Sequence, residues 1–279
     1  MKVAYCIGGQ FRNFEDCIKN LNHYILDPLA ADVFVSTWDE SGQNLKNKKR
    51  KKKVKKISTL YLKEHLNLKA SHIIPFKKEY INQFHHFNSH NFTSTNVLSK
   101  NMPLLFYHVA KSIELMKEYE KKNNMNYDMV ILARPDLIFY SKITPRQIHF
   151  ILKDQSNILT SSFHNSFPGY FVSDMFAITT STSCLAYVHR WNNINKIIDD
   201  TITLNGYYAK KLTPENITKT ALDQYGVNYQ PAKQKFILER GRDGFILHKI
   251  KQYTLLYIQI NFLTLYLKLK KILDFFKQK

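Results

Sequence analysis

The sequence has few of the residues that mark disulfide-stapled, fibrous or membrane-spanning proteins. Only three cysteines occur and none lie in a C-x-x-C pair, so a disulfide framework and a structural zinc site are disfavoured and buried, reduced thiols are expected. Glycine and proline number eight each among 279 residues, which excludes collagen-like and Gly/Pro-rich low-complexity chains. The apolar C-terminal stretch has a charge-free interval of 16 residues, Gln252–Leu267, shorter than the about 20 apolar residues of a membrane span.

A secretory leader is also not apparent at the start of the chain. The first residues, MKVAYCIGGQFRN, contain one lysine and a very short apolar run that meets polar residues at once. A signal peptide needs a longer apolar region, so this segment predicts a first β-strand and a cytoplasmic protein.

Positive charge is concentrated in two segments. Of the net charge of +19, nine charges come from residues 44–56 and six from residues 242–279, which leaves four for the rest of the chain. The 44–56 run predicts a flexible basic insertion. Such a run can bind a phosphate backbone without sequence preference, but it contains no aromatic residue for base stacking, which disfavours nucleic acid as a partner.

The C-terminal segment, residues 245–279, predicts a basic amphipathic helix that follows a domain of residues 1–244. On a helix its polar residues form one narrow stripe: Thr254, Asn261, Thr264, Lys268, Lys271 and Gln278. Apolar residues cover the remaining surface and lysines crowd the end, a pattern typical of a helix lying on an anionic membrane surface. Packing against the protein's own body and binding to a protein partner are the two alternatives.

Apolar runs of strand length alternate with segments of helical periodicity along the domain. This alternation predicts an α/β fold with a mostly parallel sheet and helices on both faces. The expected strands are residues 2–7, 31–38, 71–75, 128–132, 157–161 and 171–179, and the expected helices are residues 13–26, 57–66, 102–122, 144–152 and 182–198.

Two charges interrupt the most apolar stretch of the chain, VILARPDLIF at residues 130–139. Pro135 lacks an N–H and disfavours continued pairing, so Arg134 and Asp136 should mark the end of a strand. In a parallel sheet that end opens onto the ligand crevice. Arg134 suits a phosphate, and Asp136 suits a divalent cation or a sugar hydroxyl. A purely structural Arg–Asp pair is the alternative.

A second candidate segment, IGGQFRN, follows the first strand. Gly8 and Gly9 would let the backbone approach a ligand, and Arg12 would stand at the start of the next helix, where anions are favoured. The segment is neither a G-x-G-x-x-G nor a Walker loop, so a plain strand–helix turn is the alternative.

A third candidate is Asp174 in GYFVSDMFAITT, which interrupts an apolar strand beside a loop that also holds His164. Its carboxylate could accept a proton from a sugar hydroxyl or help to hold a metal ion. Asp223 and Glu239 are second choices for the same role. A residue that only caps or turns the local backbone is the alternative reading of Asp174.

Taken together, the segments KVAYCIGGQFRNFEDCIKNL, LAADVFVSTWD, YDMVILARPDLIF and SDMFAIT resemble the WavE-related glycosyltransferases of bacterial lipopolysaccharide and capsule biosynthesis, which are similar to GT-A nucleotide-sugar enzymes. The resemblance covers about residues 1–195. It implies a GT-A-like (Rossmann-like) fold that holds a nucleotide-diphosphate sugar near Gly8, Gly9, Gln10 and Arg12. It also aligns Arg134-Pro135-Asp136 with the Asp-x-Asp metal motif of that family, with arginine in place of the first aspartate.

The resemblance implies transfer of a sugar from this donor to a growing surface polysaccharide or a lipid-linked acceptor, by a protein peripheral to the inner membrane. Arg134 would neutralise the diphosphate, Asp174 would act as the base, and Asp136 would bind Mn²⁺ or Mg²⁺ if a metal is used. Tyr5 and Trp38 would stack on base or sugar. A phosphotransferase of the same pathway and a nucleic-acid-binding protein are the alternative functions.

Overall fold

The computed structural model describes most of the first 238 residues. The described ranges are 1–12, 14–41, 54–76, 97–160, 172–205, 213–232, 234 and 236–238. The chain divides into two units, Met1–Arg240 and Gly241–Lys279. The expected amphipathic helix at 245–279 and most of the basic run at 44–56 lie outside the described residues. Within the described ranges, no helix is both long and apolar enough to cross a bilayer.

A seven-stranded sheet forms the centre of the first unit, in the order β3-β2-β1-β4-β7-β6-β8. Its strands are β1 (Val3–Gly8), β2 (Asp32–Trp38), β3 (Leu68–Ile74), β4 (Met129–Ala133), β6 (Asn157–Thr160), β7 (Phe176–Thr179) and β8 (Asn228–Pro231). Pairing is parallel except at β7, which runs antiparallel to both β4 and β6. The expectation of a mostly parallel sheet is therefore confirmed.

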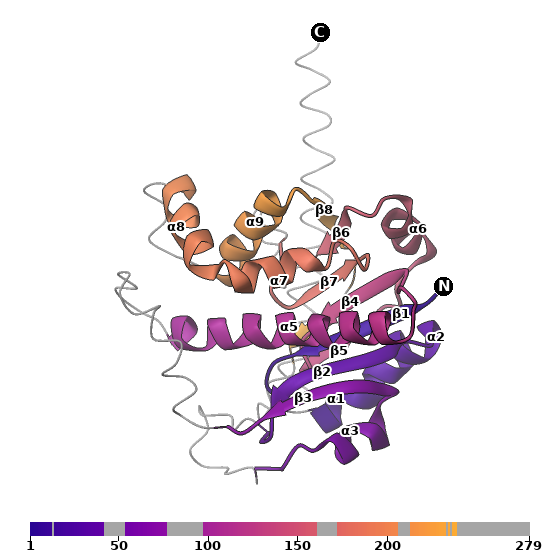
Figure 1. The fold of residues 1–279 in the computed structure, drawn as a ribbon. Coiled ribbons are helices and arrows are strands. Elements are labelled where there is room, and N and C mark those ends of the chain that lie inside the picture. The colour runs from indigo at the N-terminus through magenta and orange to yellow at the C-terminus, as the bar shows by residue number, and fades with distance from the viewer. Residues whose placement is uncertain are drawn as a thin grey trace, which may run out of the picture. The chain divides into compact units, whose positions relative to one another are not determined.

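The strand order contains a topological switch point between β1 and β4. From β1 the chain moves outward to β2 and β3, and then returns through the long helix α5 (Val97–Lys122) to β4, on the other side of β1. Figure 1 shows α5 lying across these strands. In sheets of this kind ligands bind where the strand order reverses, outside the carboxyl ends of the strands. We call the edge where β1, β2 and β4 end the carboxyl edge, and the opposite edge the amino edge.

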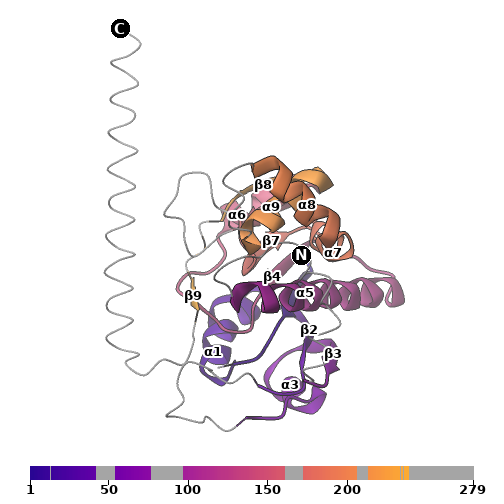
Figure 2. The same ribbon diagram turned by 90° about the vertical axis from the view of Figure 1, so that its left-hand side faces the viewer.

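Helices cover both faces of the sheet, as the sequence predicts. One face packs on α1 (Phe14–Leu21), α3 (Thr59–His65) and α6 (Pro145–Lys153), which contribute Phe14, Ile18, Leu62 and Ile151 to one core cluster. The other face packs on α5, α7 (Leu185–Asn192) and α9 (Pro214–Tyr225), which contribute Val109, Ile113, Met116, Ala186 and Leu222 to a second cluster. Figure 2 shows α7, α8 (Ile194–Asn205) and α9 gathered beside α5. Strands buried on both faces read as continuous apolar runs, which is why their alternation is weak.

Several boundaries differ from the sequence prediction. The predicted helix at 13–26 is α1, a π-helical turn at Asn22–Leu26 (η1) and a short α2 (Asp27–Leu29). The predicted helix at 182–198 is two helices that meet at Asn193, whose backbone N–H and side-chain amide both donate to the carbonyl of His189. Local bonding by asparagine competes with helix continuation, so the chain turns here.

The apolar stretch at 130–139 supplies two different sheets. Residues up to Ala133 belong to β4, whereas Leu137–Phe139 form β5, which pairs antiparallel with β9 (Phe236–Leu238) in a separate two-stranded sheet. The turn between them contains Pro135, which has no N–H to continue the ladder. The charges at 134 and 136 thus occupy a turn between two buried strands.

Candidate functional site

The carboxyl edge brings the predicted site segments together at the switch point. β1 and β4 are paired from Val3↔Met129 to Ile7↔Ala133, so the residues that follow them emerge side by side. Arg12 follows β1, and Arg134 follows β4 directly. β7 runs the opposite way and begins at the same edge, with Phe176 opposite Ala133. Asp174, two residues before β7, therefore enters the site from a third strand.

Arg134 and Asp136 form a two-pronged ion pair across Pro135. Arg134 Nε donates to Asp136 Oδ1 at 2.9 Å, and Arg134 Nη2 donates to Asp136 Oδ2 at 2.8 Å. The Asp136 side chain is 0% exposed and that of Arg134 is 18% exposed. The backbone N–H of Arg134 also donates to the carbonyl of Met175, which fixes the turn against the start of β7. The structural Arg–Asp pair is thus present. The remaining guanidinium nitrogen of Arg134, Nη1, takes no part in it.

The charge of Asp136 is held by its surroundings. Burial opposes ionisation, but the Arg134 charge, its hydrogen bonds and the charge of Arg12 outweigh burial and lower the pKa of Asp136. Arg134 in turn has a raised pKa, because the attraction of Asp136 and Asp174 outweighs the effect of burial. The charge of Arg12 thus affects Asp136, and the charge of Asp174 affects Arg134. These electrostatic effects between segments indicate that the four residues form one cluster.

Asp174 differs from Asp136 in its electrostatic state. Burial and the like charge of Asp136 raise the pKa of Asp174, while Arg134 and Arg190 offset part of that rise. Its backbone is held by Ser173, whose N–H donates to Thr160 Oγ1 at 2.8 Å and whose Oγ accepts from Met175 N at 2.9 Å. A partly buried carboxylate with a raised pKa is the kind of group that can accept a proton in catalysis, and Asp174 forms no short ion pair with the described residues.

Arg190 on α7 joins this cluster and was not predicted. It is 0% exposed and acts on Asp174 from the helical layer above the sheet. Its signal in the sequence is a single arginine on the apolar face of a helix, since Ala186, Tyr187 and Arg190 lie at helical spacing and are all buried. We call Arg12, Arg134, Asp136, Asp174 and Arg190 the charge cluster.

The glycines after β1 have explanations within the fold. A Cβ on Gly8 would stand 2.5 Å from the backbone N of Val109, so Gly8 is needed for the close approach of β1 to α5. Gly9 has φ of 116°, which favours glycine, and its N–H donates to the carbonyl of Ser36. Gln10 is partly buried beside them. Whether this turn also meets a ligand stays a prediction.

Trp38, which the sequence analysis named, ends β2 at the carboxyl edge, and His108 packs beside it, which the sequence did not reveal. His108 on α5 is buried, its Nδ1 lies 2.8 Å from Ser36 Oγ, and its ring packs edge-on against Trp38 at 4.8 Å between centroids. Burial and the nearby His72 lower the pKa of His108 to about 3, so the ring is neutral. Its Nε2 is buried without a hydrogen-bond partner in the described part of the chain.

The remaining candidates are placed as follows. Tyr5 is buried in the core, on the α1 side of the sheet. Asp223 lies on α9, where it pairs with Lys219 and accepts from the Tyr229 hydroxyl; within the described ranges these contacts do not join it to the charge cluster. His164 and Glu239 lie outside the described residues.

The described side chains at this edge do not fit a divalent cation. Both oxygens of Asp136 already accept from Arg134, whose charge would repel a metal ion. No group of three histidine, cysteine, aspartate or glutamate residues within the described ranges could hold one. The metal role foreseen for Asp136 has no support from this geometry, and Arg134 itself supplies the positive charge at this position.

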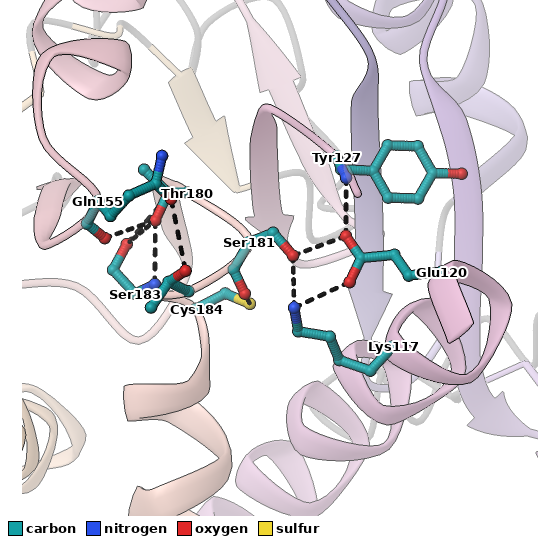
Figure 3. A network of polar contacts seen from close by, with 9 residues as sticks. Lys117, Glu120, Tyr127, Gln155, Thr180, Ser181, Ser183 and Cys184 are labelled. Carbon is teal, nitrogen blue, oxygen red and sulfur yellow. Dashed lines mark hydrogen bonds and ion pairs between the residues drawn. The ribbon is translucent and has the colours of Figure 1, made fainter. Parts of the chain in front are cut away.

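A second polar network lies at the amino edge. Glu120 on α5 is 4% exposed and accepts from the Ser181 hydroxyl at 2.6 Å, from the backbone N–H of Tyr127 at 2.7 Å and from Lys117 Nζ at 2.8 Å. Figure 3 shows these groups converging on the carboxylate. Ser181 follows β7 and Tyr127 precedes β4, so Glu120 ties the two strands to α5. Every carboxylate oxygen is satisfied, which is the mark of a structural network.

A comparison with protein-family models and with curated proteins finds no match to this chain. Function is therefore inferred from the residues of the carboxyl edge.

Proposed function

We propose that the chain is a nucleotide-sugar-dependent glycosyltransferase of GT-A-like architecture. The observation that carries the proposal is the charge cluster at the switch point between β1 and β4, where an open α/β sheet binds ligands. There Arg12 and Arg134 supply positive charge from two strand ends, and Asp174 supplies a carboxylate from a third. These are the groups that glycosyl transfer requires: a cation for the leaving diphosphate and a base for the acceptor hydroxyl.

The guanidinium groups would act on the donor. Breakage of the bond between the sugar's anomeric carbon and the diphosphate oxygen leaves negative charge on that oxygen. Arg134 would meet this charge through Nη1, because Asp136 occupies its Nε and Nη2 edge. Asp136 would then position Arg134 without touching the substrate. Arg12 would share the diphosphate charge from the end of β1, at the start of α1, where anions are favoured.

Asp174 would act on the acceptor. Its raised pKa makes it a stronger base than an ordinary aspartate, and it stands free of the short pair that engages Asp136. It would take the proton of the acceptor hydroxyl as the new carbon–oxygen bond forms. Arg134 and Arg190 offset part of the rise in the pKa of Asp174 and so favour its ionised, proton-accepting form.

The nucleoside half of the donor would lie over the ends of β1 and β2. Among the described residues, Nε2 of His108 is buried there without a hydrogen-bond partner, and the rings of Trp38 and Tyr107 pack against the histidine. A neutral imidazole nitrogen can donate to or accept from the edge of a base, according to its tautomer.

The acceptor would be a growing surface polysaccharide or a lipid-linked glycan at the cytoplasmic face of the inner membrane. The basic charge of residues 44–56 and 242–279 supports the proposal that the protein acts at an anionic membrane surface. The identity of the acceptor is inferred from this charge and from the sequence resemblance.

The proposal is tested by incubating the full-length chain with a panel of nucleotide-diphosphate sugars and measuring release of the nucleoside diphosphate. Slow hydrolysis of one donor is expected without any acceptor, with release that is faster when lipid-linked glycans are added. Release should persist in EDTA, because Arg134 stands where the metal motif would be. An Asp174→Asn variant should lose the acceptor-dependent part.

Two other outcomes would redirect the assignment. Transfer of the phosphoryl group would make the protein a phosphotransferase that uses the same arginines. Absence of turnover with every donor, together with a thermal shift on single-stranded oligonucleotides but not on nucleotide sugars, would favour nucleic-acid binding.

A further inference from the structure

Arg190 is a fully buried charged side chain at the carboxyl edge, and its surroundings fix it in place. Its guanidinium carbon lies 3.7 Å from the centroid of the Phe106 ring and 5.0 Å from that of Tyr187. Nη1 donates to Thr218 Oγ1 at 2.6 Å. One arginine thus joins α5, α7 and α9, and its guanidinium lies over two aromatic rings.

The other edge of the same guanidinium has nothing to bind. Nε and Nη2 of Arg190 are buried and have no hydrogen-bond partner among the described residues. The same two nitrogens of Arg134 donate to both oxygens of Asp136. A buried donor left without an acceptor costs about 1–3 kcal/mol, and more when it is charged. If Arg190 served only to hold α5, α7 and α9 together, burying its Nε and Nη2 would cost free energy without any gain in stability.

The charge of Arg190 is also incompletely balanced. No acidic group of the described chain lies within ion-pair distance of it, and Asp174, the carboxylate that acts on it, is shared with Arg134. The charge cluster holds three arginines and two aspartates, which leaves one positive charge in excess. Burial lowers the pKa of Arg190 to about 10, but leaves it protonated at neutral pH.

We propose that the Nε and Nη2 edge of Arg190 binds an oxyanion carried by a ligand, either a carboxylate or a phosphate group. Both groups offer two oxygens at the spacing of this fork, and a buried fork binds them more strongly than one in water. The Asp174 and Arg134 end of the cluster keeps some exposure to solvent, so the oxyanion would enter beside Asp174. The fork of Arg190 belongs to a different residue from Arg12 and Arg134, to which the donor diphosphate is assigned, so this proposal does not depend on the proposed transfer reaction. If both hold, one substrate carries an acidic group of its own.

The test is thermal unfolding of the full-length chain with sodium glucuronate or sodium phosphate, against sodium chloride of equal ionic strength. An anion at about ten times its Kd should raise the Tm by about 3–5 °C. Arg190→Met should abolish that rise. Arg190→Lys, which keeps the charge but has no fork, should weaken it and serves as the second variant if Arg190→Met does not fold. A rise with glucuronate alone identifies a carboxylate, and one with phosphate alone identifies a phosphate.

Two controls separate binding from structure. Thr218→Val removes the acceptor of Nη1, so it should lower the Tm in chloride and keep the anion-dependent rise. Arg146→Gln changes an exposed arginine on α6 and should behave like the parent chain. The proposal is overturned if neither anion raises the Tm, if the rise survives in both Arg190 variants, or if it is lost in Arg12→Gln and retained in Arg190→Met. None of these results depends on glycosyl transfer.

Discussion

The two edges of the sheet treat buried polar groups in opposite ways. At the amino edge, the Glu120 carboxylate meets a lysine, a hydroxyl and a backbone N–H, and each oxygen is satisfied (Figure 3). At the carboxyl edge, the described part of the chain leaves Arg190 Nε and Nη2 and His108 Nε2 buried without partners. Asp174 lies at the same edge, and burial raises the pKa of its carboxyl group.

The contrast distinguishes a network that stabilises the fold from buried groups that we propose meet a ligand. A network in which every group is paired holds elements together and gains nothing from a ligand. Buried groups without partners cost free energy, and proteins keep them where a substrate completes them. The amino edge therefore fastens α5 to β4 and β7, while the carboxyl edge of the same strands is where we propose that a ligand binds.

The largest effect is expected at Asp174. Asp174→Asn should lower the rate of acceptor-dependent transfer roughly 10²–10⁴-fold, because the acceptor hydroxyl loses its base. The raised pKa means that folding disfavours the charge of Asp174, so the free energy of unfolding should stay equal or rise. Donor-release kinetics and chemical denaturation of the same sample measure both quantities. A clear loss of stability with an unchanged rate would reverse the roles assigned to the two edges.

The opposite outcome is expected at Glu120. Glu120→Gln should lower the free energy of unfolding by about 2–3 kcal/mol, because an amide cannot accept all three hydrogen bonds and leaves the charge of Lys117 without its partner. The rate per folded molecule should not change. Urea denaturation is the measurement, and Glu118→Gln, an exposed change on the same helix, is the matched control with an effect near zero.

Gly8 tests how tightly the carboxyl end of β1 meets α5. Gly8→Ala should cost about 3 kcal/mol, because its Cβ would press on the backbone of Val109, which belongs to a long helix and cannot give way. Gly226→Ala is the control: its φ is 73° but its Cβ would meet nothing within 4 Å, so only about 1 kcal/mol of backbone strain is expected. Equal losses in the two variants would mean that the contact with α5 is not the reason for glycine at position 8.

The smallest effect concerns His108 and pH. A folded-state pKa of about 3, below the unfolded value of 6.5, means that the stability is fully present above pH 6.5 and is lost as the pH falls toward 3. By pH 5 the loss should reach roughly 2 kcal/mol. His108→Gln should have a shallower decline of unfolding free energy between pH 6.5 and 5. Parallel declines would show that the histidine of the carboxyl edge is solvated in solution.

Much of the fold follows from the sequence because alternating apolar runs and helical patterns determine an α/β sandwich. The strand end at Arg134 was predictable as well, since Pro135 and two charges cannot continue a buried ladder. The antiparallel direction of β7 and the small sheet of β5 and β9 were not predictable, because pairing direction depends on contacts between distant segments.

The candidate site was predictable only in part, for a related reason. Arg12, Arg134, Asp136 and Asp174 each interrupt or follow an apolar strand, so their place at a sheet edge could be read from the chain. Arg190 and His108 lie on helices, where a buried charge or ring has the same spacing as the core. Only packing shows which of their atoms lack partners, and those atoms distinguish the two edges.

The central claim is that Arg134 and Asp136 serve a ligand and are not only a structural pair. Replacing both at once, as Arg134→Met with Asp136→Leu, removes two buried charges without leaving either unpaired, a change that is often neutral for stability. Calorimetric titration of this double variant with the nucleoside diphosphate of the active donor tests the claim most directly. The variant is expected to fold and to bind the diphosphate at least about tenfold more weakly than the parent chain, since it lacks the guanidinium. Binding with the parent affinity in a folded variant would contradict the claim.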